Sequence, residues 1–370
     1  MSFIPVNTPS LRGNEKQYLC DCIDSGWISS EGPFVTQLEE IACGVFQTSH
    51  AIAVSSGTAA LDIAIDSLGL SVGDEVILPS FTIISCIHQI IRSGLKPVLI
   101  DSDPVTWNIN HTLIAEKITS RTRAIMVVHT YGLPVDLDPI LHLCNKHGLY
   151  LIEDTAELIG HTYKGKPCGS FGDISILSFY PNKHVTTGEG GMILTSNASL
   201  ANTCRSLRNL CFDNTARFVH RRLGWNYRLS NLHAAVGVAQ FELLQETLAI
   251  KRKIGMTYSS SLKQINKLQI PLDCTQYASN IYWVFGILID PTLGSASDFI
   301  LKYRELGIGT RPFFCPMHRQ PVLKSLGLFP SEEYPVADYL YAQGLYLPSG
   351  VGLTEDQLSH VIEITLNLFS

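Results

Sequence analysis

The chain has 370 residues, of which 45% are hydrophobic and 16% are charged. This composition is typical of a folded globular protein and excludes a chain that is disordered throughout. A formal net charge of −6 argues against a general nucleic-acid binder, and no apolar run approaches the roughly 20 residues of a membrane helix. We therefore expect neither nucleic acid nor a membrane as a partner, and any anionic ligand must be held by a local site.

The N-terminal residues and the cysteines indicate the cellular location of the protein. Residues 1–5 contain no basic residue and no apolar stretch of the kind found in a secretory signal. The ten cysteines are scattered, and the closest pair, Cys20 and Cys22, is spaced too tightly for a usual zinc site. We predict reduced cysteines in a cytoplasmic enzyme and no bound metal.

Short apolar runs alternate with amphipathic stretches between residues 51 and 195. Strands are predicted over residues 51–55, 75–78, 97–100, 124–128, 149–152, 174–179 and 191–195. Helices are predicted over residues 58–68, 83–92, 112–118 and 137–147. This alternation predicts an α/β fold with a large, mostly parallel sheet. Such sheets bind ligands outside the carboxyl ends of their strands, so the loops that follow the strands form the candidate site.

The second part of the chain has a different pattern. A long helical stretch covers residues 231–265, and it is followed by a strand over 282–289, a helix over 297–306 and a terminal helix over 355–368. A length of 370 residues also exceeds that of most single domains. We predict a large domain over residues 1–245 and a smaller C-terminal α+β domain over residues 246–370.

Two of the loops after strands contain candidate ligand-binding residues. Ser56-Gly57-Thr58 joins a strand to a helix, where free N–H groups and the helix dipole can hold a phosphate, although it also fits a plain helix cap. Glu153 and Asp154 end a buried strand, and a carboxylate there can bind a metal, orient a base or pair with a protonated ring nitrogen. No histidine and carboxylate cluster at metal-ligand spacing accompanies them, which weakens the metal interpretation.

A third loop contains a lysine soon after a strand. Lys183 lies five residues after Ser178, and burial there can lower its pKa so that its amine acts as a nucleophile. The glycine-rich residues 187–191 lack the pattern of a P-loop. Each loop is a weak signal alone. In this order they provide what pyridoxal 5′-phosphate (PLP) needs, namely a phosphate cup, a partner for the pyridinium nitrogen at Asp154 and an amine for the Schiff base.

The same residues carry a resemblance to a known family. Residues 56–58 (SGT), 153–157 (EDTAE) and 178–191 (SFYPNKHVTTGEGG) resemble motifs of the DegT/DnrJ/EryC1/StrS sugar aminotransferases, and the similarity extends over nearly the whole chain. The resemblance implies PLP fold type I, the fold of aspartate aminotransferase, with a large mostly parallel sheet domain and a smaller C-terminal domain. It also implies PLP as the cofactor and a homodimer with shared active sites.

The resemblance further implies roles for individual residues. Lys183 would carry the cofactor and move protons between the cofactor and the sugar, Asp154 would pair with the pyridinium nitrogen, and Glu157 would lie near the ring hydroxyl. Ile83 takes the position where relatives have an aromatic residue that stacks on the ring, and Phe81 stands two residues earlier. The remaining cofactor contacts that it implies are Ser56, Gly57, Thr58 and Ser178 and, from a loop that reaches the neighbouring subunit's cofactor, Asn226 and Arg228.

Substrate contacts are expected from Trp27, His129 and His318, although each histidine also fits a purely structural role. A basic segment between residues 205 and 228 can hold a diphosphate or form a solvated face. Its arginines are Arg205, Arg208, Arg217, Arg221, Arg222 and Arg228.

Within the family, the chain resembles the branch that moves an amino group, from L-glutamate, onto C4 of the nucleotide-linked sugar GDP-4-keto-6-deoxymannose for the synthesis of surface glycans such as O-antigen. Lys183 favours transamination, because the related dehydratases carry histidine at that position. Two alternatives stay open. One is amination at C3 or C4 of a dTDP- or UDP-linked ketosugar, and the other is a non-catalytic regulatory or binding protein with the PLP fold.

Overall fold

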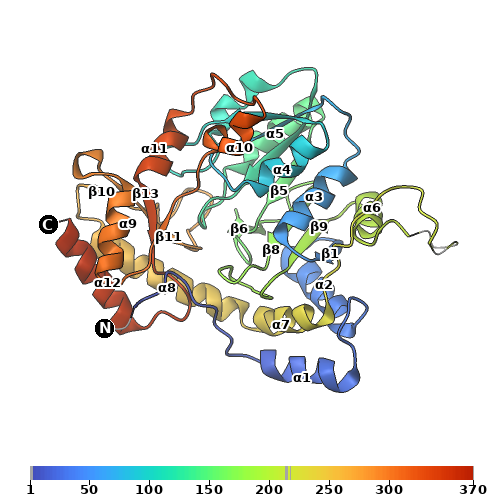
Figure 1. The fold of residues 1–370 in the computed structure, drawn as a ribbon, viewed down its shortest axis with the longest axis horizontal. Coiled ribbons are helices and arrows are strands. Elements are labelled where there is room, and N and C mark those ends of the chain that lie inside the picture. Colours follow the sequence, from blue (N-terminus) through green and yellow to red (C-terminus); the bar gives the residue numbers. More distant parts are fainter. Residues whose placement is uncertain (1–2, 213–215, 217, 370) are drawn as a thin grey trace.

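The computed structural model describes residues 3–212, 216 and 218–369 (Figure 1). Its larger sheet has seven strands in the order β1-β9-β8-β5-β4-β2-β3. They are β1 (His50–Val54), β2 (Glu75–Pro79), β3 (Lys96–Ile100), β4 (Thr122–Val128), β5 (Tyr150–Asp154), β8 (Ile174–Ser178) and β9 (Gly191–Thr195). β9 runs antiparallel to both of its neighbours, and all other neighbouring strands are parallel. The predicted large, mostly parallel sheet is confirmed.

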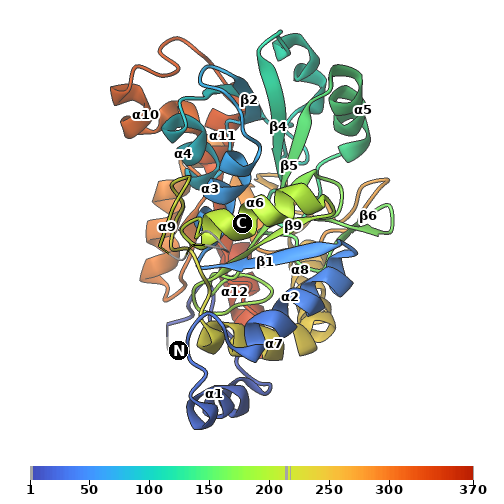
Figure 2. The same ribbon diagram turned by 90° about the vertical axis from the view of Figure 1, so that its right-hand side faces the viewer.

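Helices cover both faces of this sheet, because the side chains of each strand alternate between the faces. In β4, Met126 packs with one helical layer, and Ile125 and Val127 pack with the other. The first layer consists of α3 (Gly57–Ser67), α4 (Ser85–Arg92) and α6 (Ala198–Arg208). The second consists of α2 (Pro33–Phe46), α5 (Leu137–His147) and α7 (Asn231–Glu242), with α1 (Glu15–Ser25) packed on α7. In Figure 2, α6 lies on one side of β1 and β9, and α2 and α7 lie on the other.

Two predicted helices differ from those observed. The helix predicted over residues 112–118 is replaced by two short 3₁₀ turns, η1 (His111–Leu113) and η2 (Ala115–Lys117). The Asn110 side chain accepts the N–H of Thr112 at 3.2 Å, and the β-branched residues of this segment disfavour a longer helix. The helix predicted over residues 231–265 is broken at Leu243, whose N–H bonds back to Gln240, so that α8 (Leu244–Leu262) is separate from α7. None of the helices in the described ranges combines the length and hydrophobicity that a bilayer crossing requires.

A second, antiparallel sheet lies in the C-terminal part of the chain. Its strands, in spatial order, are β10 (Leu268–Gln269), β11 (Phe285–Ile289), β13 (Gly344–Leu347) and β12 (Arg311–Pro312). Its core is shared with α8, α9 (Ala296–Glu305) and α12 (Glu355–Leu368). The other elements are β6 (Thr162–Tyr163), β7 (Lys166–Pro167), η3 (Pro291–Leu293), η4 (Met317–Arg319), α10 (Pro321–Ser325) and α11 (Pro335–Gln343). A domain boundary between residues 245 and 246 stays our proposal, at the start of α8.

The N-terminal segment connects the two sheets. Ile4 is buried in the core of the C-terminal sheet and forms a parallel bridge with Ile308. The N–H of Gly309 donates to the carbonyl of Ile4 at 2.7 Å. From there the segment runs to α1, which lies beside α7 under the large sheet (Figure 1). The start of the chain is therefore held by its C-terminal third.

Candidate active site

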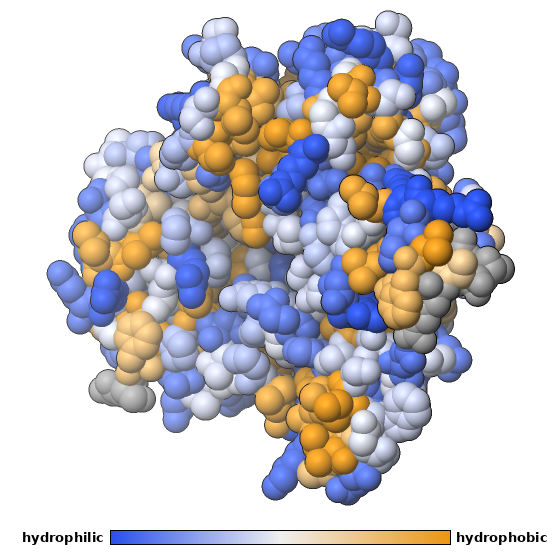
Figure 3. All heavy atoms as spheres, turned by 45° about the vertical axis from the view of Figure 1, so that its right-hand side comes forward, coloured by the Kyte–Doolittle hydropathy of each residue, from blue (hydrophilic) through white to orange (hydrophobic). Residues whose placement is uncertain are grey.

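A cavity of about 290 Å³ lies at the carboxyl ends of β4, β5 and β8, and residues of the C-terminal part of the chain close its other side. Figure 3 shows the surface hollowed between the part that carries the C-terminal sheet and the part that carries the large sheet. Parallel strands of a sheet end at one edge, so residues far apart in the sequence meet there. The cavity brings together eight of the predicted site residues, which are Ser56, Gly57, Thr58, Ile83, Asp154, Glu157, Ser178 and Lys183.

The start of α3 forms one end of this cavity. Ser56 has an extended backbone and caps the helix, because its Oγ accepts the N–H of Ala59 at 3.0 Å. The N–H groups of a first helical turn have no partner within the helix, and Gly57 and Thr58 both line the cavity. A Cβ atom on Gly57 would lie 2.8 Å from the Cβ of Ser178, so the close approach of these loops requires glycine. The arrangement fits an anion such as a phosphate.

Asp154 ends β5 on the floor of the cavity. Its Oδ1 accepts the N–H of Ala156 at 3.0 Å, and the thiol of Cys86 donates to its Oδ2 at 3.4 Å. Burial raises the pKa of this carboxyl group. A protonated ring nitrogen in the cavity would favour the ionised form of Asp154, and a carboxylate has acceptor capacity beyond these two bonds. The residue therefore fits the predicted pyridinium partner.

The neighbouring Glu153 points to the opposite face of the sheet, as strand geometry requires. It accepts the N–H groups of Gly169 at 2.6 Å and Phe171 at 3.0 Å, and it lies 3.1 Å from Nε2 of His129. Nδ1 of His129 accepts the N–H of Val135 at 3.0 Å, and His129 is fully buried. Both ring nitrogens of His129 are used inside the protein and it does not line the cavity, so this arrangement favours the structural role over the predicted contact with substrate.

Lys183 projects into the cavity from the turn that follows β8. Its Nζ lies 3.8 Å from Oε1 of Glu157 and 3.8 Å from the ring centroid of Trp283. Burial lowers the pKa of Lys183, and burial raises the pKa of Glu157 to about 7. The other carboxylate oxygen of Glu157 accepts the N–H of Tyr131 at 2.7 Å. The two side chains can therefore share a proton near neutral pH.

Aromatic residues that the sequence did not single out complete the wall of the cavity. Trp283, Phe314 and Tyr346 all come from the C-terminal part of the chain. The indole N–H of Trp283 donates to the carbonyl of Asn182 at 2.8 Å, which ties this wall to the Lys183 turn. Trp283 falls within an apolar run that predicts only a strand, and nothing in its spacing relates it to Lys183. The contact is a product of tertiary packing.

The structure decides which residue of the turn after β2 borders the cavity. Ile83 lines the cavity and is 47% exposed. Phe81 is buried, and its ring packs against those of Tyr131 and Phe314 at centroid distances of 6.0 Å each. An aliphatic side chain, and not Phe81, is therefore available to a ring in the cavity.

Four other predicted residues do not reach this cavity. Trp27 is half-exposed, and its carbonyl accepts the side-chain N–H of Asn231 at 2.7 Å. Arg228 donates to Asn226 at 3.0 Å and borders a second cavity, of about 640 Å³. His318 is buried between Ser80 and Asp338, whose oxygens lie 2.8 and 2.9 Å from its two nitrogens, and this arrangement favours its structural role over the predicted contact with substrate.

Three of the six arginines of the basic segment form ion pairs with acidic residues of the same chain. Arg208 lies 2.7 Å and Arg205 3.8 Å from Glu39, and Arg222 lies 3.1 Å from Asp66. These pairs reduce the positive charge that a diphosphate would meet. Arg217 lies outside the described residues.

Comparison with known proteins identifies the family. The model of the DegT/DnrJ/EryC1/StrS aminotransferase family matches residues 9–365. The chain is 39% identical to a GDP-perosamine synthase of Caulobacter vibrioides, over 97% of this chain and 96% of that protein. It is 37% identical to a GDP-perosamine synthase of Vibrio cholerae, over 99% of each protein. The crystal structure of the aminotransferase TlmJ from Streptoalloteichus hindustanus superposes with a TM-score of 0.92 at 27% identity, over 99% of this chain and 98% of that one.

The family match covers almost the whole chain, and the cavity holds a lysine, a strand-end aspartate and a helix N-terminus at one sheet edge. The chain belongs to the DegT/DnrJ/EryC1/StrS aminotransferase family and is a PLP-dependent nucleotide-sugar aminotransferase.

Proposed function

We propose that the protein transfers an amino group from L-glutamate to C4 of GDP-4-keto-6-deoxymannose and so makes GDP-perosamine for surface-glycan synthesis. The observation that carries the amine chemistry is the position of Lys183, whose amino group lies beside Glu157 in a cavity that also contains Asp154 and Ser178. Similarity over nearly the full chain to two GDP-perosamine synthases supports the choice of sugar nucleotide.

The cavity residues fit the cofactor. PLP, when bound, supplies an aldehyde carbon that takes up an amine and a ring that accepts the electrons released from a neighbouring carbon. Gly57, Thr58 and Ser178 would hold its phosphate, with Ser56 keeping the helix end in place. Asp154 would pair with its ring nitrogen. The side chain of Ile83 would cover a ring face through dispersion contacts.

Lys183 acts as nucleophile and proton carrier in this proposal. A lysine serves in either role only when its amine is neutral, and burial of Lys183 lowers its pKa in that direction. Glu157 lies within 3.8 Å and has a pKa near 7, so it can hold the proton that Lys183 gives up. The aromatic wall of Trp283, Phe314 and Tyr346 limits the access of water to these groups.

We further propose a homodimer in which Asn226 and Arg228 serve the neighbouring subunit's cofactor. Both residues lie away from their own chain's cavity. Leu223, close to both residues in the sequence, is 91% exposed, and Ile28, in the N-terminal part of the chain, is 50% exposed. Such exposure is common where a second copy binds.

All ten cysteines are free thiols, which supports the prediction of a reducing, cytoplasmic location.

The sugar nucleotide is tested by comparing kcat/KM for GDP-, dTDP- and UDP-linked 4-keto-6-deoxyhexoses with L-glutamate as donor. We expect the GDP sugar to be preferred by at least tenfold, and NMR of the product to place the amine on C4. A preference for a dTDP or UDP sugar, or an amine on C3, would replace the proposal by the first alternative. Biological activity that survives in a Lys183→Ala variant would favour the non-catalytic alternative.

A further inference from the structure

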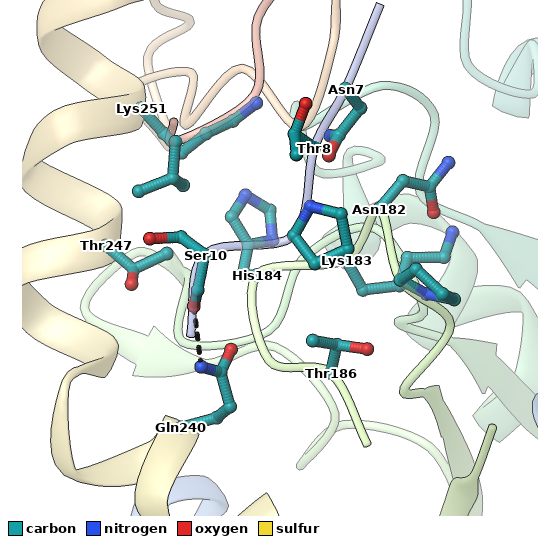
Figure 4. A pocket seen from close by; sticks show the side chains of 13 residues that line it. Asn7, Thr8, Ser10, Asn182, Lys183, His184, Thr186, Gln240, Thr247 and Lys251 are labelled. Carbon is teal, nitrogen blue, oxygen red and sulfur yellow. Dashed lines mark hydrogen bonds between the residues drawn. The ribbon is translucent and has the colours of Figure 1, made fainter. Parts of the chain in front are cut away.

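A second, smaller space lies behind Lys183, on the side away from the cofactor cavity. It measures about 20 Å³. Its walls come from the turn of residues 181–186, the N-terminal segment of residues 7–10, and the helices α7 and α8 (Figure 4). We call it the rear chamber. Nothing in the proposed reaction uses it.

Lys183 borders both spaces, whereas the next residue, His184, borders only the rear chamber. The Lys183 side chain projects away from α8, and the His184 ring lies between the N-terminal segment and α8, as Figure 4 shows. Ser10, Thr247 and Lys251 stand on the far side of that ring from Lys183. Any group that holds His184 therefore acts on the backbone from which Lys183 projects.

The His184 ring has an unusual position for a polar group. It is 3% exposed, and among the described residues neither Nδ1 nor Nε2 has a hydrogen-bond partner. Burial lowers the pKa of His184 well below its usual range, so the ring is neutral at pH 7 and carries one donor and one acceptor. Buried polar groups of this kind are nearly always bonded, often by an ordered water molecule.

The chamber has the size and the polarity that a single water molecule needs. A volume of about 20 Å³ exceeds the roughly 10–15 Å³ required for one water. Lys251 donates to the carbonyl groups of Trp283, at 2.7 Å, and Ser349. Burial lowers the pKa of Lys251 to about 7, so the amine offers the chamber a third N–H when protonated and a lone pair when neutral. Gln240 donates to the carbonyl of Ser10 at 2.9 Å, the dashed line in Figure 4, and so holds the N-terminal segment over the chamber.

We propose that the rear chamber binds one ordered water molecule through His184, and that His184 is thereby a positioning residue for Lys183. The Lys183 turn is then held from both sides, by the indole N–H of Trp283 on Asn182 and by the water-bridged imidazole of His184. Precise placement matters because a small displacement of a reacting group slows catalysis greatly. The inference rests on the PLP chemistry of the family and is independent of which sugar is the substrate.

Two substitutions at His184 are expected to have different effects on the Tm. His184→Phe keeps a ring of similar size but removes both polar atoms, and His184→Gln keeps one donor and one acceptor. If water bridges the imidazole, the Phe variant should lower the Tm by about 3 °C or more while the Gln variant stays near the native value. If the chamber is dry, Phe removes an unpaired polar group and should leave the Tm unchanged or raise it. A high-resolution crystal structure of the native enzyme should show one density peak beside the ring.

The positioning role has its own measurement, the pH at which the visible absorption of the PLP-loaded enzyme changes. We expect His184→Phe to shift this midpoint by about 0.5 pH units or more, and His184→Gln to restore it. The control is His161→Phe, because His161 is also a buried imidazole whose pKa burial lowers, to about 3, but it does not line the chamber. Its substitution should leave the midpoint unchanged.

Each part of the proposal has a result that overturns it. A native structure without density in the chamber, or a His184→Phe variant at least as stable as the native protein, overturns the water site. A Phe variant that is less stable but keeps the native midpoint overturns the positioning role. If the Phe variant does not fold, the density in the native structure tests the water site. The absorbance midpoint of His184→Gln then tests the positioning role, and a shift away from the native midpoint in that variant overturns it. None of these outcomes depends on the sugar, so they are separate from the test of the proposed substrate.

Discussion

The centre of the indole ring of Trp283 lies 3.8 Å from the amino group of Lys183, although the two residues are 100 positions apart. Lys183 follows a strand of the large sheet, and Trp283 precedes a strand of the C-terminal sheet. A cation is attracted to the face of an aromatic ring, most strongly to that of tryptophan. The contact therefore offers a resting position for the charged amine of Lys183. The same indole donates to Asn182, so one side chain supports both the amine and its turn.

Replacing Trp283 with leucine should remove both interactions. We expect kcat to fall by about tenfold to a hundredfold, since a cation–π contact and a hydrogen bond each contribute about 1 kcal/mol. The pKa of Lys183 should fall further, because the charged form loses its partner. Trp283→Phe keeps the ring face and should lie between the native and leucine variants. Absorbance titration of the PLP-loaded enzymes follows the protonation of the Lys183 nitrogen once it is joined to the cofactor, whose charged form would lose the same ring partner, and equal midpoints in all three would contradict the expected fall.

The raised pKa of Glu157 predicts how the stability of the protein without cofactor depends on pH. Its pKa in the folded protein is raised to about 7 by burial, against 4.5 when unfolded, so the folded state binds the proton more tightly. The contribution of Glu157 to stability is therefore full below pH 4.5 and is lost as the pH rises through 7. We expect the native protein to lose up to about 3 kcal/mol relative to Glu157→Gln between pH 5 and pH 8. Urea unfolding of both apoproteins at the two pH values tests this, and parallel pH profiles would refute it.

The close contact of Gly57 with Ser178 predicts that no side chain fits at position 57, where the start of α3 is proposed to hold the phosphate. Gly57→Ala places a Cβ 2.8 Å from the Cβ of Ser178, so the loops must separate. We expect the Kd for PLP to rise at least tenfold and stability to fall by about 1–3 kcal/mol. Gly44→Ala is the control, because a Cβ there meets no atom within 4 Å and alanine favours the interior of α2. Equilibrium dialysis with PLP should separate the two variants, and similar affinities would show that the cup tolerates a side chain.

The proposed shared-site dimer predicts complementation between two variants that should each be inactive alone. In Lys183→Ala the amine is missing, and in Arg228→Ala the contact from the neighbouring subunit is missing. Refolding the two together should restore activity at about one quarter of the sites, because half of the dimers are mixed and each holds one intact site. Each variant refolded alone is the control. Mixtures that stay inactive would show that Arg228 serves its own subunit, and an Arg228→Ala variant that is active alone would show that it serves neither site.

Local patterns predicted that Ser56, Asp154 and Ser178 would lie close together. Ser56, Asp154 and Ser178 each follow from a strand end, and parallel strands end at one edge, so chain order alone was enough to place them together. The sequence could not show which long-range partners complete the wall, as with Trp283. It also could not show that His129 already has partners on both nitrogens. A histidine in a loop after a strand has the same local sequence whether it faces a ligand or a buried glutamate.

The bridge between Ile4 and Ile308 has a consequence for synthesis and engineering of the chain. These residues are 304 positions apart, so Ile4 can find its partner only after the intervening chain has been made. Closing such a long loop is a late event with an entropic cost that local elements do not bear. A bulky group attached beside Ile4 would lie next to the C-terminal sheet and close to residues 7–10, which line the rear chamber. Such a group is thus expected to slow this late step of folding.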